Sequence, residues 1–447
     1  MPSPTPSKQN FHNPPPIRCA LLGLGTVGSS VAQLLSSQPH INITQAVAKN
    51  LTKKRDLGRF SPVLSDDPIT IASDPHIDVV IECLGGIEPS VSVIRAALTS
   101  GKHVVTANKD VMATYGHELR ELATQHNVYL KYEAAVCAGI PLISPLQQSL
   151  GANQVKALMG ILNGTCNYIL SRMSQDNWDY ETALHKAQEL GFAEADPTND
   201  VSGLDAAYKL AILSYEAFGF NIAPQDIPRE GIDQLNVKDI QLAQSMGYTV
   251  KLLGIAEHNQ QQNSQEQLNV RIHPALVPNT HPLASIHDEY NALWLQGDAV
   301  DDLMFYGKGA GGDPTASGVC GDLLSILPLI QSNQPSQQLS SPNKHEAPLT
   351  LQPTESTISK WYLRFKAPDT PGVVGHIGSA FGHSGVSIES IIQQGTHPDG
   401  TASIVVVTQP QTEGALQDAL HSVTHNTVPD TPSAGKTQLA CKLRILS

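Results

Sequence analysis

The chain has 447 residues, of which 40% are apolar, 15% are charged and 5% are aromatic, and its formal net charge is -13. At about 100–200 residues per domain this length predicts two to four domains, and the apolar fraction argues against wholesale disorder. The acidic balance argues against a nucleic-acid or anionic-membrane binder, because such proteins need clustered Lys and Arg. No stretch approaches the ~18 consecutive apolar residues of a membrane span. Six scattered cysteines without a CxxC pair indicate reduced thiols in a cytoplasmic protein.

Residues 1–16 are rich in proline and lack an apolar run, which predicts a disordered tail rather than a secretory signal. In residues 17–150, strand and helix patterns alternate, which predicts βαβ units and an α/β domain with a doubly wound, Rossmann-type parallel sheet. The expected strands are residues 17–22, 41–48, 77–83, 103–106 and 128–132, and the expected helices are residues 31–36, 91–98 and 118–124.

Residues 151–313 predict an α+β domain for substrate binding and dimerisation, and a helix near residues 314–330 is expected to complete the first domain. Residues 331–358 are rich in Ser, Gln, Pro and Asn, which is typical of a linker. Residues 359–447 follow the order βαββαβ, which predicts a ferredoxin-like domain. The expected helices after residue 150 are residues 182–190, 203–218, 237–246, 316–330, 373–381 and 414–423; the strands are residues 268–277, 292–299, 361–366, 386–393, 403–408 and 439–446.

A glycine-rich turn follows the first expected strand and opens a helix. It reads Gly23-Leu24-Gly25-Thr26-Val27-Gly28 and matches GxGxxG. In this context the pattern predicts a dinucleotide site, with the pyrophosphate at the helix N-terminus, although a tight turn without a ligand is the alternative. After the second strand no carboxylate is placed to hold a ribose hydroxyl, whereas Lys49 and Arg55 could face a 2′-phosphate. The sequence therefore favours NADP over NAD. The alternative is that these cations lie in a solvated loop and contact no cofactor.

The densest polar cluster lies around residues 194–209. Asp205 and Lys209 are four residues apart on an expected helix, so they share one face, and Glu194 lies in the preceding loop. Two carboxylates and an amine suit a small zwitterionic substrate, with the acids on its ammonium and the lysine at a hydroxyl proton. A capped helix with an ordinary ion pair is the alternative.

Residues 187–197, AQELGFAEADP, continue through Asp200, Gly203, Asp205 and Lys209, and this run resembles the signature of homoserine dehydrogenases. Residues 106–109, 132–136, 160–165, 309–311 and 314–316 resemble the same family. The likeness covers about residues 17–330. It departs from the family pattern at Cys137, Cys166 and Ser202, where glycine, threonine and glutamate are usual.

The resemblance implies NAD(P)-dependent interconversion of L-homoserine and L-aspartate 4-semialdehyde, in threonine, methionine and isoleucine biosynthesis. It implies proton transfer by Lys209 and Lys109, and binding of the substrate by Glu194, Asp205 and Lys209. The residues it places near the nicotinamide are Thr106, Asn108, Lys109, Gly309 and Gly311. The alternatives are another NADP-linked oxidoreductase of small amino acids and a cofactor-binding sensor without turnover.

Residues 133–140 resemble the monovalent cation loop of the same family. The implied ligands are mostly backbone carbonyls, which suit a hard cation because such an ion prefers oxygen ligands. Na⁺ is the favoured ion. The residues concerned are Glu133, Val136, Ala138 and Ile140. A turn without an ion is the alternative.

Residues 366–374, together with Ser387 to Ser390 and Gln393, resemble an ACT domain. The resemblance implies an amino-acid site at Asp369 and Gly372 and feedback control by L-threonine. It also implies pairing of ACT domains in a homodimer or homotetramer, and a dimerising or vestigial module without a ligand is the alternative.

Overall fold

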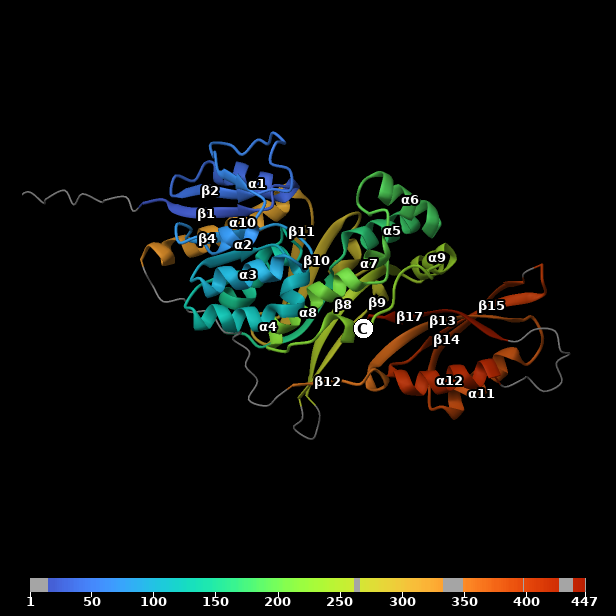
Figure 1. The fold of residues 1–447 in the computed structure, drawn as a ribbon. Coiled ribbons are helices and arrows are strands. Elements are labelled where there is room, and N and C mark those ends of the chain that lie inside the picture. The colour runs from blue at the N-terminus through green and yellow to red at the C-terminus, as the bar shows by residue number, and fades with distance from the viewer. Residues whose placement is uncertain (1–14, 261–265, 333–348, 397, 426–436, 447) are drawn as a thin grey trace, which may run out of the picture. The chain divides into compact units, whose positions relative to one another are not determined.

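Figure 1 shows a computed structural model, which describes residues 15–260, 266–332, 349–396, 398–425 and 437–446. The chain divides into two compact units, residues 1–139 with 311–338 and residues 140–310 with 339–447. The predicted disordered tail lies almost wholly outside the described residues. Within the described residues, no helix combines the length and apolarity needed to cross a bilayer.

The first unit is built on a parallel sheet whose strands follow the order β3-β2-β1-β4-β5-β6. This order is that of a Rossmann-type domain, so the predicted doubly wound sheet is confirmed. Helices α1 and α10 pack together, and their apolar side chains form one core with β1, β2, β4 and β5. The strands are β1 (Ile17–Leu22), β2 (Ile41–Val47), β3 (Val63–Ser65), β4 (Val79–Glu82), β5 (His103–Thr106) and β6 (Leu130–Lys131). The helices are α1 (Thr26–Leu35), α2 (Pro68–Ala72), α3 (Ser90–Thr99), α4 (Lys109–Gln125) and α10 (Gly312–Gln331), with a 3₁₀ turn η1 (Glu133–Ala135).

The second unit contains a long sheet in the order β11-β10-β7-β8-β9-β17-β13-β15-β14. The sheet of the middle of the chain continues into that of the C-terminal domain, because β17 pairs in parallel with β9 at Arg444–Ala275 and Ile445–Leu276. The strands of the middle part are β7 (Val155–Ile161), β8 (Tyr248–Gln260), β9 (Glu266–Pro278), β10 (Tyr290–Gly297) and β11 (Asp302–Lys308). Its helices are α5 (Gly164–Gln175), α6 (Tyr180–Glu189), α7 (Thr198–Val201), α8 (Leu204–Phe218) and α9 (Val237–Ser245), with short turns η2 (Pro145–Ser149), η3 (Pro224–Asp226) and η4 (Pro282–Ser285).

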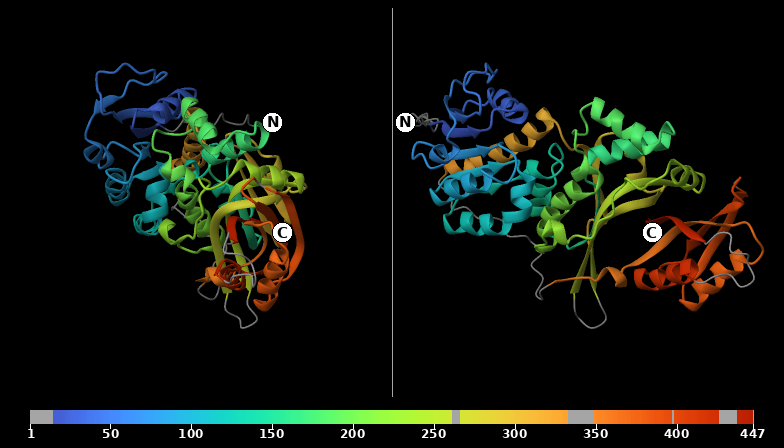
Figure 2. Two further views of the ribbon diagram at one scale, coloured as in Figure 1. Left: turned by 90° about the vertical axis from the view of Figure 1, so that its right-hand side faces the viewer. Right: turned by 45° about the vertical axis from the view of Figure 1, so that its right-hand side comes forward.

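The C-terminal domain has the predicted βαββαβ order, so the ferredoxin-like fold is confirmed. Helices α11 and α12 lie together on one face of its sheet, as two views show (Figure 2). Its elements are β13 (Ile358–Pro368), α11 (Val373–His383), β14 (Ile388–Thr396), β15 (Thr401–Thr408), β16 (Gln411–Thr412), α12 (Glu413–His425) and β17 (Gln438–Ile445). The predicted linker is not wholly irregular, since it contains β12 (Thr350–Leu351), which pairs with β9, and the turn η5 (Thr354–Ser356).

Candidate active site

The turn after β1 has the backbone geometry that a pyrophosphate loop needs. Gly23 has a φ of 99°, and a Cβ there would lie 2.4 Å from the Cys83 carbonyl oxygen. A Cβ at Gly28 would lie 1.9 Å from the Gly23 carbonyl oxygen, so only glycine lets α1 pack this closely. A Cβ at Gly25 would meet nothing within 4 Å. The three glycines thus provide the sharp turn, the open approach and the close helix packing, and α1 begins at Thr26 with its amides toward that opening.

The cationic loop after β2 folds back onto the glycine turn. Arg55 Nε donates to the Leu24 carbonyl oxygen at 3.0 Å, and its Nη1 donates to the carbonyl oxygens of Asn50 and Lys53, each at 2.9 Å. Lys49 is exposed just after β2. The loop therefore holds one guanidinium beside the turn.

Glu82, which no sequence motif singles out, joins the carboxyl ends of β4 and β5. Its fully buried carboxylate accepts hydrogen bonds from Thr106 Oγ1 at 2.5 Å, Ser90 Oγ at 3.0 Å and Leu84 N at 2.8 Å. Thr106 Oγ1 in turn accepts a hydrogen bond from Asn108 N at 3.0 Å. The position of Thr106 is therefore fixed from two sides.

Asn108 and Lys109 lie where β5 leads into α4. Asn108 Oδ1 accepts a hydrogen bond from Val111 N at 3.1 Å and so caps the helix, and its Nδ2 donates to the Gly86 carbonyl oxygen at 2.7 Å. The Lys109 side chain is 37% exposed, and its Nζ lies 3.8 Å from Asp110 Oδ1. Asn108 thus shapes the strand end, while Lys109 is the accessible amine there.

Asp205 and Lys209 form a buried ion pair in the second unit, at the spacing that predicts one shared helix face. Lys209 Nζ donates to Asp205 Oδ2 at 2.7 Å and to the Leu162 carbonyl oxygen at 2.7 Å. Asn163 Nδ2 donates to the same Asp205 oxygen at 2.8 Å and to Asp200 Oδ1 at 2.7 Å. Each side chain of the pair is only 11% exposed, which is unlike a solvated i,i+4 pair on a surface helix.

Asn163 lies just after β7 and reaches these carboxylates because it caps α5. Asn163 Oδ1 accepts a hydrogen bond from Cys166 N at 2.8 Å, so Asn163 Nδ2 points to the ion pair. Cys166 Sγ donates to the Asp200 carbonyl oxygen at 3.2 Å, a hydrogen bond that a threonine hydroxyl could also make. Burial raises the pKa of the Cys166 thiol well above its usual value, which fits a packing role better than that of a nucleophile.

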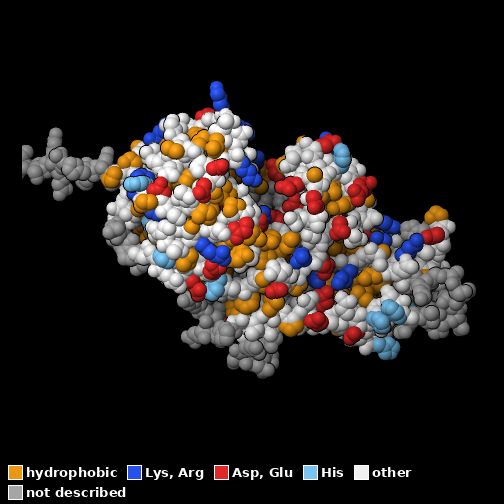
Figure 3. Space-filling model, viewed as in Figure 1, with side chains coloured by type: hydrophobic (Ala, Val, Ile, Leu, Met, Phe, Trp, Pro, Cys, Tyr) orange, Lys and Arg blue, Asp and Glu red, His pale blue; other side chains and the backbone are white. Residues whose placement is uncertain are grey.

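Glu194 lies in the exposed segment between α6 and α7. Its carbonyl oxygen accepts a hydrogen bond from Gln188 Nε2 at 3.1 Å, which ties the segment to α6. Acidic side chains gather over this α6–α7 part of the molecule (Figure 3). Binding of the substrate by Glu194 stays a prediction.

Local packing accounts for Gly309, and backbone conformation accounts for Gly311. A Cβ at Gly309 would lie 2.2 Å from Asn291 Oδ1, so glycine makes room for that side chain. Gly311 has a φ of 114° and directly precedes α10. An approach of either residue to a nicotinamide ring stays a prediction.

The segment that resembles a cation loop has an unusual backbone. Cys137 and Ala138 have φ values of 48° and 23°, a region that favours glycine, and glycine is the usual residue at position 137 in the family. Asp322 Oδ2 accepts a hydrogen bond from Glu133 N at 2.7 Å, and the Glu133 carbonyl oxygen accepts one from Val136 N at 3.3 Å. Burial and the Glu133 charge raise the pKa of Asp322 to about 7. The described residues contain no group of three His, Cys, Asp or Glu side chains suited to a metal, so an ion here would depend on main-chain carbonyls.

In the C-terminal domain, Asp369 and Gly372 lie in the loop between β13 and α11. Asp369 Oδ1 accepts a hydrogen bond from Gln393 Nε2 at 2.9 Å, which joins the loop to β14. Gly372 has a φ of 95° and precedes the first residue of α11. The loop therefore presents helix N-terminal amides, a geometry that suits a carboxylate.

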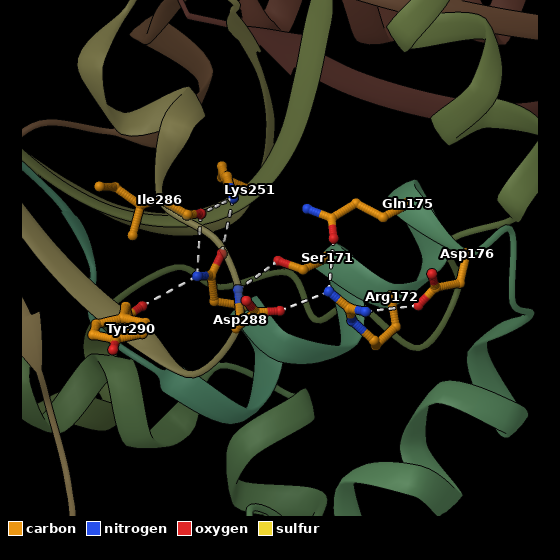
Figure 4. Close-up of polar contacts among 9 residues, drawn as sticks. Ser171, Arg172, Gln175, Asp176, Lys251, Ile286, Asp288 and Tyr290 are labelled. Carbon is orange, nitrogen blue, oxygen red and sulfur yellow. Dashed lines mark hydrogen bonds and ion pairs between the residues drawn. The ribbon is translucent and has the colours of Figure 1, made fainter.

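A second buried lysine, Lys251 of β8, which the sequence motifs also miss, lies beside α5 (Figure 4). Lys251 Nζ donates to Asn167 Oδ1 at 3.1 Å and to the Ile286 carbonyl oxygen. Asn167 Nδ2 also donates to the carbonyl oxygens of Ile286 and Tyr290, at 3.3 Å and 3.1 Å. Burial lowers the pKa of Lys251 to about 8. This network joins β8 and the segment before β10 to α5, the helix that Asn163 caps.

Comparison with known proteins gives one consistent result along the chain. Residues 141–324 match the family model for homoserine dehydrogenase, residues 23–133 that for the homoserine dehydrogenase NAD-binding domain, and residues 361–425 that for the ACT domain. A homoserine dehydrogenase of Synechocystis is 43% identical over 93% of this chain and 98% of that protein, and one of Bacillus subtilis is 38% identical over 91% and 94%. The crystal structure of a homoserine dehydrogenase from Thiobacillus denitrificans matches with a TM-score of 0.86 at 35% identity, over 96% of this chain and 98% of that chain.

Proposed function

Because the chain belongs to the homoserine dehydrogenase family and carries its NAD-binding domain and an ACT domain, we propose that it interconverts L-homoserine and L-aspartate 4-semialdehyde with NADP, under feedback control by L-threonine. The observation that carries the proposal is the buried ion pair of Asp205 and Lys209, held by Asn163 and the Leu162 carbonyl oxygen. A protein that only senses a cofactor has no need of such a pair.

We assign Lys209 to proton transfer at the substrate's 4-oxygen. The Asp205 carboxylate accepts a hydrogen bond from Lys209 Nζ at 2.7 Å and so orients the amine that exchanges the proton. In the reductive direction the aldehyde carbon accepts a hydride, and the aldehyde oxygen takes a proton from Lys209 Nζ. In the oxidative direction the proton returns to the same nitrogen. General acid–base catalysis of this kind contributes about 10²–10⁴ in rate.

Asp205 and Glu194 are the proposed partners of the substrate's ammonium group, and Lys109 is the proposed second amine at the 4-oxygen. The burial of Asp205 supports this role, because a carboxylate shielded from water attracts a cation more strongly. The position of Lys109 directly after β5 supports its role at the 4-oxygen, since ligands of such sheets bind at the carboxyl ends of the strands.

The glycine turn fits a dinucleotide, because Gly25 leaves its surroundings open and α1 begins beside it. When bound, the nicotinamide supplies the hydride acceptor or donor. The preference for NADP is supported by the residues between Lys49 and Arg55, which include four cations and no carboxylate. Arg55 is held beside the turn by the Leu24 carbonyl oxygen, where a 2′-phosphate could use it.

We also propose a monovalent cation, Na⁺ by preference, held by main-chain oxygens of Glu133, Val136, Ala138 and Ile140. The left-handed backbone at Ala138 supports this, because such a turn can aim successive carbonyls toward one point.

In the ACT domain, L-threonine is the proposed effector, with its carboxylate at the start of α11 near Gly372 and its ammonium near Asp369. Strand β14 ends the ACT sheet on one side, and a second chain pairing there would protect its unpaired backbone groups. We therefore propose a homodimer or a homotetramer.

The test is the nicotinamide absorbance of the purified chain with NADP and L-homoserine, with and without L-threonine. We expect homoserine-dependent NADPH formation that L-threonine lowers. Turnover with a different amino alcohol would favour another oxidoreductase of small amino acids, and NADP binding with no turnover would favour a sensor. Turnover that threonine leaves unchanged would reject only the regulatory part.

A further inference from the structure

Arg444, on the last strand of the ACT domain, connects that domain to a segment of the substrate domain. Its side chain is 7% exposed, with Nη1 donating to Glu230 Oε1 at 2.7 Å and Nη2 donating to Glu413 Oε2 at 2.7 Å. The guanidinium lies over the Trp361 ring at 4.6 Å from its centroid. Glu413 and Trp361 belong to the ACT domain, whereas Glu230 follows η3 in the substrate domain. Arg444 is thus fixed on one side and holds Glu230 on the other.

The segment that contains Glu230 is packed between β9 and the end of α7. Glu230 N donates to the Ile272 carbonyl oxygen at 2.8 Å, and Ile232 N donates to the Val201 carbonyl oxygen at 2.9 Å. A Cβ at Gly231 would lie 2.5 Å from that same Val201 oxygen, so the segment and α7 are in close backbone contact.

Three residues after Val201 the chain begins α8, the helix that carries the ion pair. Gly203 has a φ of 82° and precedes α8, and a Cβ there would lie 3.1 Å from Ile272 Cγ2. Asp205 and Lys209 follow within the first two turns of α8. The same Ile272 therefore contacts both the Glu230 segment and the start of this helix.

We infer that Glu230 and Arg444 are positioning residues for the substrate site. Arg444 keeps the segment at residues 229–232 against the start of α8, and thereby fixes where Asp205 meets the substrate. This inference rests on the proposed function of Asp205 and Lys209. It also gives the ACT domain a physical connection to the substrate site, because a shift of β17 would move Glu230.

The partial exposure of the Glu230 side chain makes it possible to test whether this residue has a positioning role or a purely stabilising one. The Glu230 side chain is 41% exposed, and the buried Arg444 keeps Glu413 as a partner when Glu230 is replaced, so we expect loss of the Glu230 contact to cost little global stability. The chain offers a matched control, since Glu389 is 40% exposed and lies 2.7 Å from Lys360 within the ACT domain, away from the substrate helix. Loss of either pair should therefore cost similar stability, but only loss of the Glu230 pair should affect the substrate site.

The experiment compares Glu230→Gln with Glu389→Gln in the full-length chain, by steady-state kinetics and by thermal unfolding. We expect Glu230→Gln to lower kcat/KM for L-homoserine about tenfold, mainly through KM, with the KM for NADP and the unfolding temperature close to those of Glu389→Gln. Gly231→Ala should have the same effect on the KM for homoserine, because its Cβ would push the segment away from Val201 while leaving the ion pair in place.

Hydrogen–deuterium exchange of the amides of residues 201–209 gives a readout that does not depend on turnover. We expect Glu230→Gln to increase their exchange about tenfold over Glu389→Gln. Equal exchange and equal kinetics in the two variants would overturn the inference. A wild-type chain that does not oxidise homoserine would reject the proposed function alone, and the exchange result would still decide whether Glu230 positions α8.

Discussion

Replacing the buried Lys251 by methionine should change how the stability of the second unit depends on pH. Lys251 Nζ is enclosed by Asn167 and the Ile286 carbonyl oxygen, and burial lowers its pKa from 10.5 to about 8 (Figure 4). Methionine has a similar length and no charge, so it fills the site without a titrating group.

The sign follows from the protons bound in each state. Between pH 8 and pH 10.5 the unfolded chain keeps the Lys251 proton, whereas the folded chain has lost it. Stability rises with pH wherever the unfolded state binds more protons, so this lysine destabilises the fold fully below pH 8 and progressively less above it. A pKa difference of about 2.5 corresponds to roughly 3 kcal/mol over the whole window.

The assay is the thermal unfolding temperature of wild type and Lys251→Met at pH 7 and near pH 10, with Lys156→Met as the control for an exposed lysine on the same sheet. Between these two pH values we expect the free energy of unfolding of wild type, relative to that of Lys251→Met, to increase by about 2–3 kcal/mol. The difference between the two unfolding temperatures should therefore change by several degrees. Comparison with the variant removes the titration of all other groups. A difference that is constant over this pH range, as expected for Lys156→Met, would refute the reasoning.

Three further predictions concern the proposed reaction. Lys209→Ala should lower kcat by at least about 10² while the Kd of the cofactor is kept, and near-normal turnover would remove Lys209 from proton transfer. Lys49→Ala should lower kcat/KM for NADP about tenfold more than for NAD, because a charge-assisted contact to the 2′-phosphate is lost, and an unchanged preference would contradict the NADP assignment. Exchange of Na⁺ for choline should lower both activity and unfolding temperature, because an ion bound only to the folded state stabilises it; equal values in both salts would argue against an ion.

The sequence predicted the elements whose signal is local. The apolar run at residues 17–22 and the glycine turn after it predicted β1 and the start of α1, and the strand at residues 103–106 was predicted with the observed bounds. Asp205 and Lys209 were predicted to share a helix face because i,i+4 spacing alone decides it, and their 2.7 Å ion pair confirms this.

Other features depend on contacts between distant parts of the chain and carry no local signal. Strands β7 and β8 and helix α5 were not predicted, because β7 is nearly all apolar and α5 is buried around most of its surface, so neither shows a clear period. Glu82 ends an apolar strand and Lys251 lies within one, and only the partners that the fold brings to them explain how these charged groups are buried. The same holds for Arg444, whose partner Glu230 is 214 residues away.

The parallel pairing of β17 with β9 means that the ACT domain is not a detachable module. A protein shortened before this domain would expose the backbone of β9 around Ala275 and Leu276, and it would also uncover the apolar cluster that Leu446 joins. Bare strand edges beside apolar surface promote aggregation. Poor solubility of such a shortened enzyme would therefore report on its sheet rather than on its chemistry, and point changes at the effector loop are the cleaner way to separate regulation from catalysis.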